Sequence, residues 1–241
     1  MALPVDFITH LQDAGYHSRS DKHSKALAEA IVTDLMAHCP KISSFAQAGQ
    51  LVFWHNHDLT FAHSTWNTDL AIGTPPPGPL PANARSVAGM TQAVPASTRI
   101  AVELKGVMTE HGKARKNRKR DLEAHHQHVH AYDANAIAAG VIVVNASSTF
   151  QSPLRPALTI HKKPPAELIR MVADELNSVT TASGAHPYGL DAKCLLAVTM
   201  DNVNLASTSY YVRPPAPVVG SPLHWDSFIQ RICDLYGHRW P

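Results

Sequence analysis

Cysteine is scarce in this sequence: the 241 residues include only Cys39, Cys194 and Cys233. These three are widely spaced and form neither a CxxC pair nor the framework of a disulfide-rich domain, so we expect a reducing compartment. The opening stretch MALPVDFITHLQDAG lacks the charged and apolar regions of a signal peptide. No window approaches the roughly 20 apolar residues of a membrane span. Together these absences predict a cytoplasmic protein with no membrane partner.

Several catalytic motifs are also missing. The sequence has no GxxxxGK[ST] phosphate loop, no GxSxG elbow and no plausible Cys–His nucleophile pair. These absences disfavour nucleotide-driven chemistry and acyl transfer, and we expect no nucleotide cofactor. The formal net charge is only +2, so any affinity for a polyanion must come from local clusters of cations.

The composition is that of an ordinary globular protein, with 44% hydrophobic and 17% charged residues. No break in composition marks a second domain. We therefore expect a single domain over residues 1–241, with a core at about 21–147. A C-terminal extension, 151–241, would complete the fold, form an interface or read DNA.

Hydrophobic spacing predicts the elements of this core. Leu27, Ile31 and Leu35 recur at helical spacing, and Ile100, Val102 and Leu104 alternate as in a strand. A run of β-branched residues near 141–144 is typical of a strand buried on both faces. The predicted order is α-β-β-β-α-β, with a right-handed crossover and the last two strands parallel. The predicted ranges are a helix at 21–38, strands at 50–62, 67–73 and 98–106, a helix at 114–132, and a strand at 139–147.

Outside this core the expectations are simpler. The Pro-rich stretch 74–97 should be an irregular loop, either a surface insertion or a reader of base edges. The C-terminal part should contain a helix at 164–178, a strand at 192–203 and a terminal helix at 222–237.

Two acids and a lysine fall on matching strand faces. Asp69 shares a face with Ala71, and Glu103 and Lys105 share a face with Ala101. If the two strands pair with those faces aligned, two carboxylates and one ammonium converge beside small residues. Carboxylates of this kind suit Mg²⁺, and a lysine at the edge could orient water or stabilise negative charge. The alternative is an exposed ion pair across an edge strand.

This constellation resembles the PD-(D/E)xK nuclease superfamily, which includes many restriction endonucleases. The resemblance rests on Asp69 and on Glu103-Leu104-Lys105, set in the α-β-β-β-α-β order. It implies an α/β restriction-endonuclease-like core with a central mixed sheet flanked by helices. Asp69 and Glu103 would be ligands of Mg²⁺ or Mn²⁺, and Lys105 the catalytic lysine. Glu29 is the candidate for the acid on the first core helix, and Thr68 stands where proline is usual.

Six cations in eight residues follow the Glu103–Lys105 strand. Near a helix start such charges cost about 0.3–1 kcal/mol each at exposed sites, which suggests that an anion is expected there. Phosphates of DNA would satisfy them, whereas a solvated charged face is the alternative. The cations are Lys113, Arg115, Lys116, Arg118, Lys119 and Arg120.

Sixteen histidines offer a rival hypothesis. His126 and His130 stand at i, i+4 and could bind zinc, but a second pair of ligands is missing. His125 and His126 fall on the inward stripe of the predicted helix. Each is therefore either a buried structural histidine or a contact to a substrate phosphate. For the phosphate contact we select His126.

The sequence therefore predicts a Mg²⁺-dependent endonuclease that cuts double-stranded DNA, most simply a restriction or other defence enzyme. Cutting both strands suggests a homodimer or larger homo-oligomer. A repair or junction-resolving nuclease is the enzymatic alternative. A nucleic-acid-binding module on the same fold, without catalysis, is the alternative from a different class.

Overall fold

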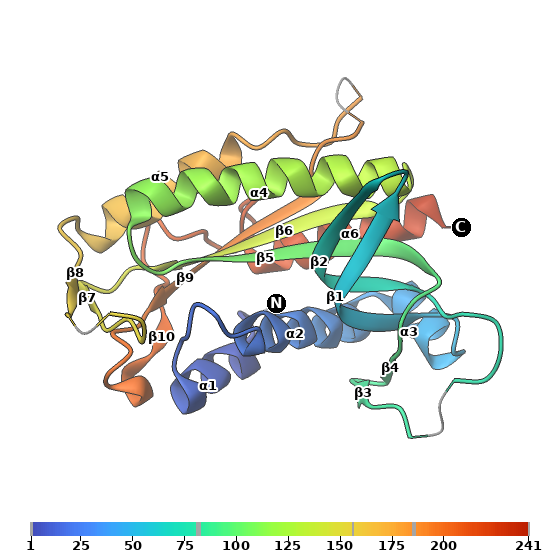
Figure 1. Cartoon of the computed structure of the whole chain (residues 1–241), viewed down its shortest axis with the longest axis horizontal. Helices are drawn as coiled ribbons and strands as arrows, with labels where there is room; N and C mark the ends of the chain where they lie inside the picture. Colours follow the sequence, from blue (N-terminus) through green and yellow to red (C-terminus); the bar gives the residue numbers. More distant parts are fainter. Residues whose placement is uncertain (1, 81–82, 156, 185–186, 241) are drawn as a thin grey trace.

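The chain folds around one central sheet (Figure 1). A computed structural model describes residues 2–80, 83–155, 157–184 and 187–240. Within them the protein is α/β, with a mixed eight-stranded sheet and six α-helices. The strand order is β10-β9-β6-β5-β2-β1-β4-β3.

The main predicted core elements occur in the predicted order, although a short helix and two short strands that were not predicted lie between them. β1 and β2 form an antiparallel hairpin, β2 is antiparallel to β5, and β6 is parallel to β5 and to β9. The crossover from β5 to β6 is made by α4, which lies along one face of the sheet (Figure 1). The bounds are α2 Lys22–His38, β1 Val52–Phe61, β2 Ser64–Thr74, β5 Ser97–Val107, α4 His111–Tyr132, β6 Ile137–Asn145 and β9 Ala192–Thr199.

Two helical layers enclose the sheet. All nine residues of β6 are buried, as its continuous apolar run predicts for a central strand. On one face, Leu27 and Ile31 of α2 join Trp225 of α6 in the core, and on the other face Leu122 of α4 joins Ile169 of α5. The C-terminal helices and the strand β9 are close to the predicted ranges. The helical bounds are α5 Pro165–Asn177 and α6 Trp225–Arg239.

Several shorter elements were not predicted. Two of them, α1 and α3, precede and follow α2 in the sequence. The Pro-rich stretch is not wholly irregular, because its strand β4 pairs in parallel with β1. Residues 81 and 82 of that stretch lie outside the described residues. None of the described helices is both long enough and apolar enough to cross a bilayer. The bounds are α1 Val5–Ala14, α3 Pro40–Gln47, β3 Ser86–Val87, β4 Met90–Gln92, β7 Thr149–Phe150, β8 Thr159–Ile160, the 3₁₀ turn η1 Leu205–Ser207 and β10 Ser209–Tyr210.

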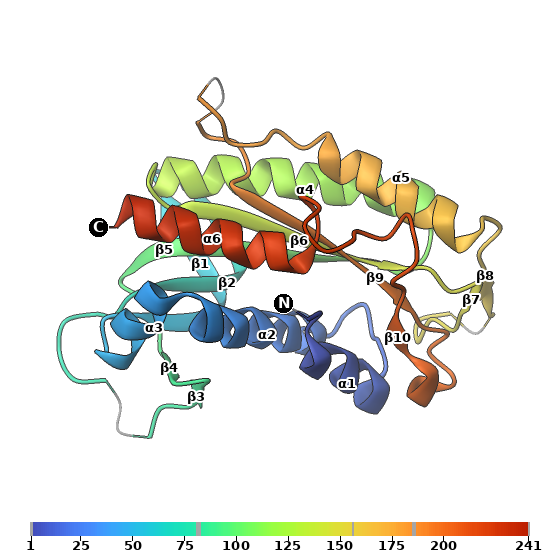
Figure 2. The same ribbon diagram turned by 180° about the vertical axis from the view of Figure 1, so that it is seen from behind.

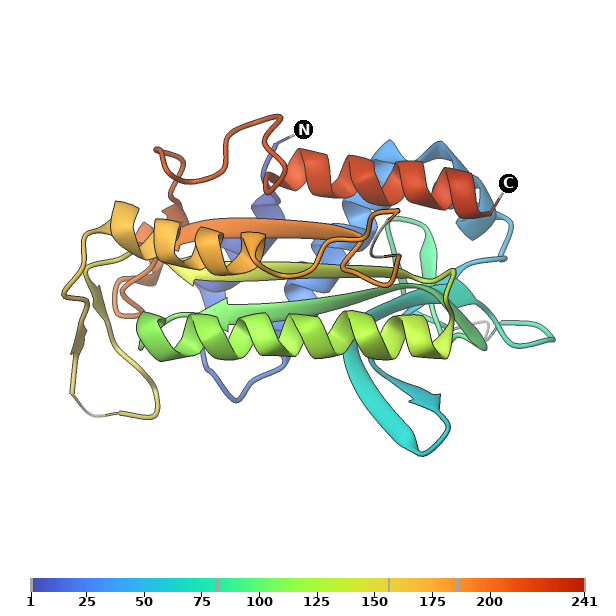
Figure 3. The same cartoon turned by 90° about the horizontal axis from the view of Figure 1, so that it is seen from above.

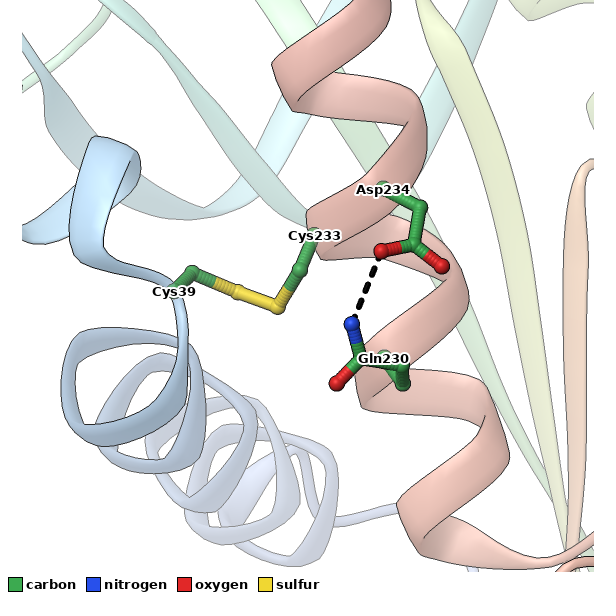
Figure 4. The surroundings of a disulfide bond; sticks show 4 residues. All are labelled: Cys39, Gln230, Cys233 and Asp234. Carbon is green, nitrogen blue, oxygen red and sulfur yellow. Dashed lines mark hydrogen bonds between the residues drawn. A yellow bond between two sulfur atoms is a disulfide. The ribbon is translucent and has the colours of Figure 1, made fainter.

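A disulfide joins Cys39 to Cys233 across 194 residues of sequence, with the two Cα atoms 5.3 Å apart (Figure 4). Cys39 lies between α2 and α3, and Cys233 lies on α6, which packs beside both helices (Figure 2). The expectation of three reduced cysteines therefore differs from the structure. The spacing rule failed because tertiary packing, not sequence proximity, brings the two thiols together. Cys194 is free and buried.

Candidate active site

The site forms where β2 separates from β5. The two strands pair from Leu70 opposite Val102 onward, and the backbone of β2 leaves β5 before that point. Two side chains of β2 then bind the free backbone groups of β5. The buried Thr68 hydroxyl donates to the Val102 carbonyl (3.0 Å), and Asp69 Oδ2 accepts from the Leu104 N–H (2.8 Å). The Asp69 carboxylate is thus fixed against the strand that carries the other candidate residues.

Glu103 and Lys105 share one face of β5, and Asp69 reaches the same place. Lys105 Nζ forms an ion pair with Glu103 Oε1 and lies 3.6 Å from Asp69 Oδ2. Because one ammonium contacts both carboxylates, the two acids lie within a few ångströms of each other. The structure therefore brings together the three residues that the sequence pattern selected.

The three side chains differ in burial. The side chain of Glu103 is only 3% exposed, whereas those of Asp69 and Lys105 are 17% and 22% exposed. Burial raises the pKa of the Glu103 carboxyl to about 7; Lys105 opposes the rise and Asp69 adds to it. For Lys105, burial lowers the pKa, but the Glu103 and Asp69 carboxylates outweigh that effect and the pKa is raised. The ammonium therefore stays charged between two acids, one of which holds its proton unusually tightly.

A histidine that the sequence analysis did not select lies behind Glu103. On β6, Gly140 pairs with Glu103, and a Cβ added at Gly140 would come 2.5 Å from Leu122 of α4, so the helix approaches the sheet closely here. One turn further along α4, the fully buried His125 places Nδ1 3.6 Å from Glu103 Oε2 and Nε2 3.3 Å from the Ala101 carbonyl oxygen. Burial lowers the pKa of His125 to about 3, so this ring is neutral. The sequence had already placed His125 on the inward-facing stripe of this helix, which was the feature that could have identified it.

His126, the histidine selected from the sequence, points elsewhere. It is 4% exposed, and its Nδ1 lies 2.6 Å from the carbonyl oxygen of Tyr188. The ring therefore contacts the loop before β9 rather than the acidic cluster. Among the described residues no group of three or more His, Cys, Asp or Glu side chains is arranged to hold a metal ion, which leaves the zinc hypothesis for His126 and His130 without a third ligand.

Glu29 also lies apart from the cluster. Both of its carboxylate oxygens accept from the Arg85 guanidinium, at 2.5 and 2.7 Å. His55, whose pKa is lowered by burial, lies 3.8 Å from the same carboxylate. No contact within the described part of the chain joins Glu29 to Asp69, and its observed role is to hold the Pro-rich stretch against α2.

Comparisons with protein-family models, with curated proteins and with solved structures found no match. What the site can do must therefore be argued from its own residues.

The donor set of the cluster fits a hard divalent cation. Asp69 and Glu103 supply carboxylate oxygens. Glu103 Oε2 is buried and has no hydrogen bond to another described residue, although the nearby Trp66 side chain opposes the rise in the Glu103 pKa. An unpaired buried carboxylate oxygen is costly, and a cation beside it would remove that cost. Mg²⁺ commonly takes one or two protein carboxylates and keeps water on its other positions. Mn²⁺ accepts the same oxygen ligands.

The cluster opens on one side to a cavity of about 360 Å³. Asp69 and Lys105 line it, together with the connection between α1 and α2. Glu103 is not among its lining residues, but it forms an ion pair with Lys105, which is. A ligand in the cavity would therefore meet Asp69 and Lys105 first.

The six cations that follow β5 divide into two groups. Three are held by acids of the protein: Arg115 by Glu175, Arg118 by Asp121 and Lys119 by Glu123. The other three are exposed and have no ion pair with any described residue. Their spacing of i, i+3 and i+7 places them along one stripe of α4. This unpaired stripe consists of Lys113, Lys116 and Arg120.

Proposed function

We propose that this protein is a metal-dependent nuclease whose reaction centre is Asp69, Glu103 and Lys105. The observation that carries the proposal is the meeting of both carboxylates at one lysine where β2 leaves β5. The α-β-β-β-α-β order of the core and the cavity beside the cluster support it. The likeness to the PD-(D/E)xK nucleases stays a proposal based on these features.

Each residue has a distinct task in this proposal. Asp69 and Glu103 would hold Mg²⁺ or Mn²⁺, Asp69 through the oxygen that does not accept from Leu104. The ion would polarise the phosphate and lower the pKa of a bound water. Lys105, charged and partly exposed to the cavity, would stabilise the negative charge that develops on the phosphate oxygens. His125 would stay neutral behind Glu103 and exclude water from that side.

The substrate proposed is double-stranded DNA. The unpaired stripe of Lys113, Lys116 and Arg120 lies on the helix that directly follows the Lys105 strand, and cations so placed neutralise backbone phosphates without reading sequence. A restriction or other defence role, with two copies of the chain cutting opposite strands, is the form of this proposal that we favour. Repair or junction-resolving activity is the enzymatic alternative.

Cleavage of supercoiled plasmid is the direct test. The wild-type protein should nick or linearise it with Mg²⁺ or Mn²⁺ and not with EDTA. Lys105→Met should abolish cutting while leaving DNA binding in EDTA largely intact, because the substitution removes the charge but keeps most of the side chain. Lys163→Met is the matched control, since Lys163 forms an exposed ion pair with Glu167 outside the site. Linear duplexes and four-way junctions, assayed in parallel, distinguish the defence proposal from the junction-resolving one.

One observation favours a second candidate, a nucleic-acid-binding module without catalysis. Glu103 is nearly inaccessible and already neutralised by Lys105, so the lysine could take the place of a metal ion permanently. Such a protein would bind DNA through the unpaired stripe and would cut no substrate with either metal. Binding without cleavage, unaffected by Lys105→Met, would select this candidate over the nuclease.

A further inference from the structure

A second cavity continues the first one away from the acidic cluster. Its volume is about 290 Å³, and it extends to Lys113 and Asn117 near the start of α4. The two cavities adjoin each other, because five residues line both of them. The shared residues are Tyr16, Ser18, Gly106, Met108 and Arg118.

We call the two adjoining cavities the Tyr16 groove. The connection between α1 and α2 forms one side of it. Seen from above, that connection and the β1–β2 hairpin both protrude past α4 on the same side of the molecule (Figure 3). The connection is fixed at Tyr16, whose backbone N–H donates to Asn202 Oδ1 (2.7 Å) and whose carbonyl accepts from Asn202 Nδ2 (3.1 Å). The Tyr16 ring stacks on His23 at 4.8 Å and meets Phe150 edge-on at 6.2 Å. Its position is therefore set from several sides.

The Tyr16 hydroxyl lies directly over the backbone that follows Lys105. A Cβ added at Gly106 would come within 2.8 Å of the hydroxyl oxygen, so a larger residue there would displace the Tyr16 hydroxyl. None of the described residues hydrogen-bonds to this hydroxyl. Burial raises the pKa of Tyr16, with Arg118 opposing, so the group remains a neutral donor at physiological pH. The groove thus holds a positioned O–H donor without a protein acceptor.

Arg118 provides the second donor. Its Nε donates to the Gly106 carbonyl oxygen (3.3 Å), and one terminal nitrogen donates to Asp121 (2.7 Å). These bonds orient the guanidinium and leave its other terminal nitrogen without a partner in the described structure, while 35% of the side chain is exposed. A planar guanidinium held in this way is suited to a phosphate.

The charge along the groove favours an anion that runs its whole length. The three acids on its lining each have a cation nearby: Asp21 pairs with Lys25 (2.5 Å), Glu110 pairs with Arg155 (2.7 Å), and Asp69 lies 3.6 Å from Lys105 Nζ. In contrast, the exposed Arg19 at one cavity and Lys113 at the other have no ion pair with a described residue.

We propose that the Tyr16 groove holds the backbone of one substrate strand beside the reacting phosphate, with the Tyr16 hydroxyl and the Arg118 guanidinium bound to the phosphate next to the cut. This inference rests on the proposed nuclease function and adds the path of the strand. Tyr16 and Arg118 are positioning residues in it. They bind the substrate equally well before and during the reaction, so their loss raises KM and leaves kcat nearly unchanged.

The test uses the full-length chain, a short fluorescent DNA duplex and two readouts. Tyr16→Phe keeps the ring that packs on His23 and Phe150 and removes only the hydroxyl. It should weaken binding in EDTA, and raise KM with Mg²⁺, by roughly tenfold, as expected for a hydrogen bond to a charged group. Arg118→Gln should do the same or more. Tyr188→Phe, which removes a hydroxyl from an exposed ring, should change neither quantity.

Binding and cleavage together separate the possible failures. If the wild-type chain cuts DNA and both variants match it in affinity and KM, the groove is wrong while the nuclease stands. If the chain binds DNA but never cuts it, the proposed nuclease function is rejected. The affinity of Tyr16→Phe for DNA then still shows whether the backbone binds in the Tyr16 groove. A fall in kcat with unchanged KM, or no DNA binding at all, overturns the groove. Lys113→Ala, an exposed change at the far end, should weaken binding about threefold even if Arg118→Gln fails to fold.

Discussion

Asp69 Oδ2 accepts a hydrogen bond from the backbone N–H of Leu104, on the strand that carries Glu103 and Lys105. The candidate ligand is therefore also a structural clamp that replaces a missing bond between β2 and β5. Substitutions at Asp69 must separate these two roles.

Asp69→Asn should separate them. The asparagine oxygen can still accept from Leu104, so the thermal midpoint should change little, whereas cleavage should fall by at least roughly 100-fold because a charged ligand is lost. Asp69→Ala should lose activity and also about 1 kcal/mol of stability, since it leaves the Leu104 N–H unpaired. Asp58→Asn, which alters a carboxylate bonded to Asn67 on the same hairpin, is the control. Full cleavage by Asp69→Asn would remove Asp69 from the reaction centre.

Glu103 should make stability depend on pH. Its pKa is about 7 in the folded chain against 4.5 for an ordinary glutamate. A raised carboxyl pKa favours folding below about pH 4.5, and this contribution is lost as the pH rises through 7. Glu103→Gln should therefore match the wild type near pH 4 and exceed it at pH 8.5 by on the order of 1–3 kcal/mol. Denaturant unfolding in EDTA at the two pH values measures the difference.

Mg²⁺ provides the control for that experiment. A cation that binds only the folded state stabilises it, so added Mg²⁺ should raise the stability of the wild type at pH 8.5 more than that of Glu103→Gln. Equal shifts in both proteins would contradict the assignment of Glu103 as a metal ligand.

The division of the basic segment into paired and unpaired cations predicts different effects of single substitutions. Replacement of Lys113, Lys116 or Arg120 by alanine should each reduce the slope of log K against log salt concentration by roughly 0.9, the value for one lost phosphate contact. Arg115→Ala should instead lower stability, because Arg115 is bonded to the half-buried Glu175. Arg213→Ala, in the exposed loop before α6, should leave the slope unchanged. Slopes from binding titrations and unfolding curves measure both quantities.

The disulfide should stabilise the fold by closing a very long loop. Cys233→Ala, or reduction of the wild type, should lower the free energy of unfolding by about 2–4 kcal/mol. Denaturant curves with and without reductant measure this loss. Reductant should have no further effect on Cys233→Ala, because Cys194 has no partner. An unchanged midpoint on reduction of the wild type would show that the bond contributes nothing in solution.

The sequence by itself determined the periodicity of the main elements and the faces of their side chains. Alternation placed Asp69, Glu103 and Lys105 on matching faces of two strands, and the β-branched run around Val141 identified the central strand. These features are local, because the period of a strand or helix follows from the backbone alone. The parallel pairing of β5 with β6 followed from the single helix that connects the two strands.

Only the tertiary structure decided which side chains meet across elements. It placed His125 rather than His126 at Glu103, engaged Glu29 with Arg85, joined Cys39 to Cys233 and brought Tyr16 over Gly106. Each of these contacts depends on how closely two elements pack and on which turn faces the neighbour. Such distances are fixed by the volumes of all the intervening side chains, and no local pattern in the sequence records them.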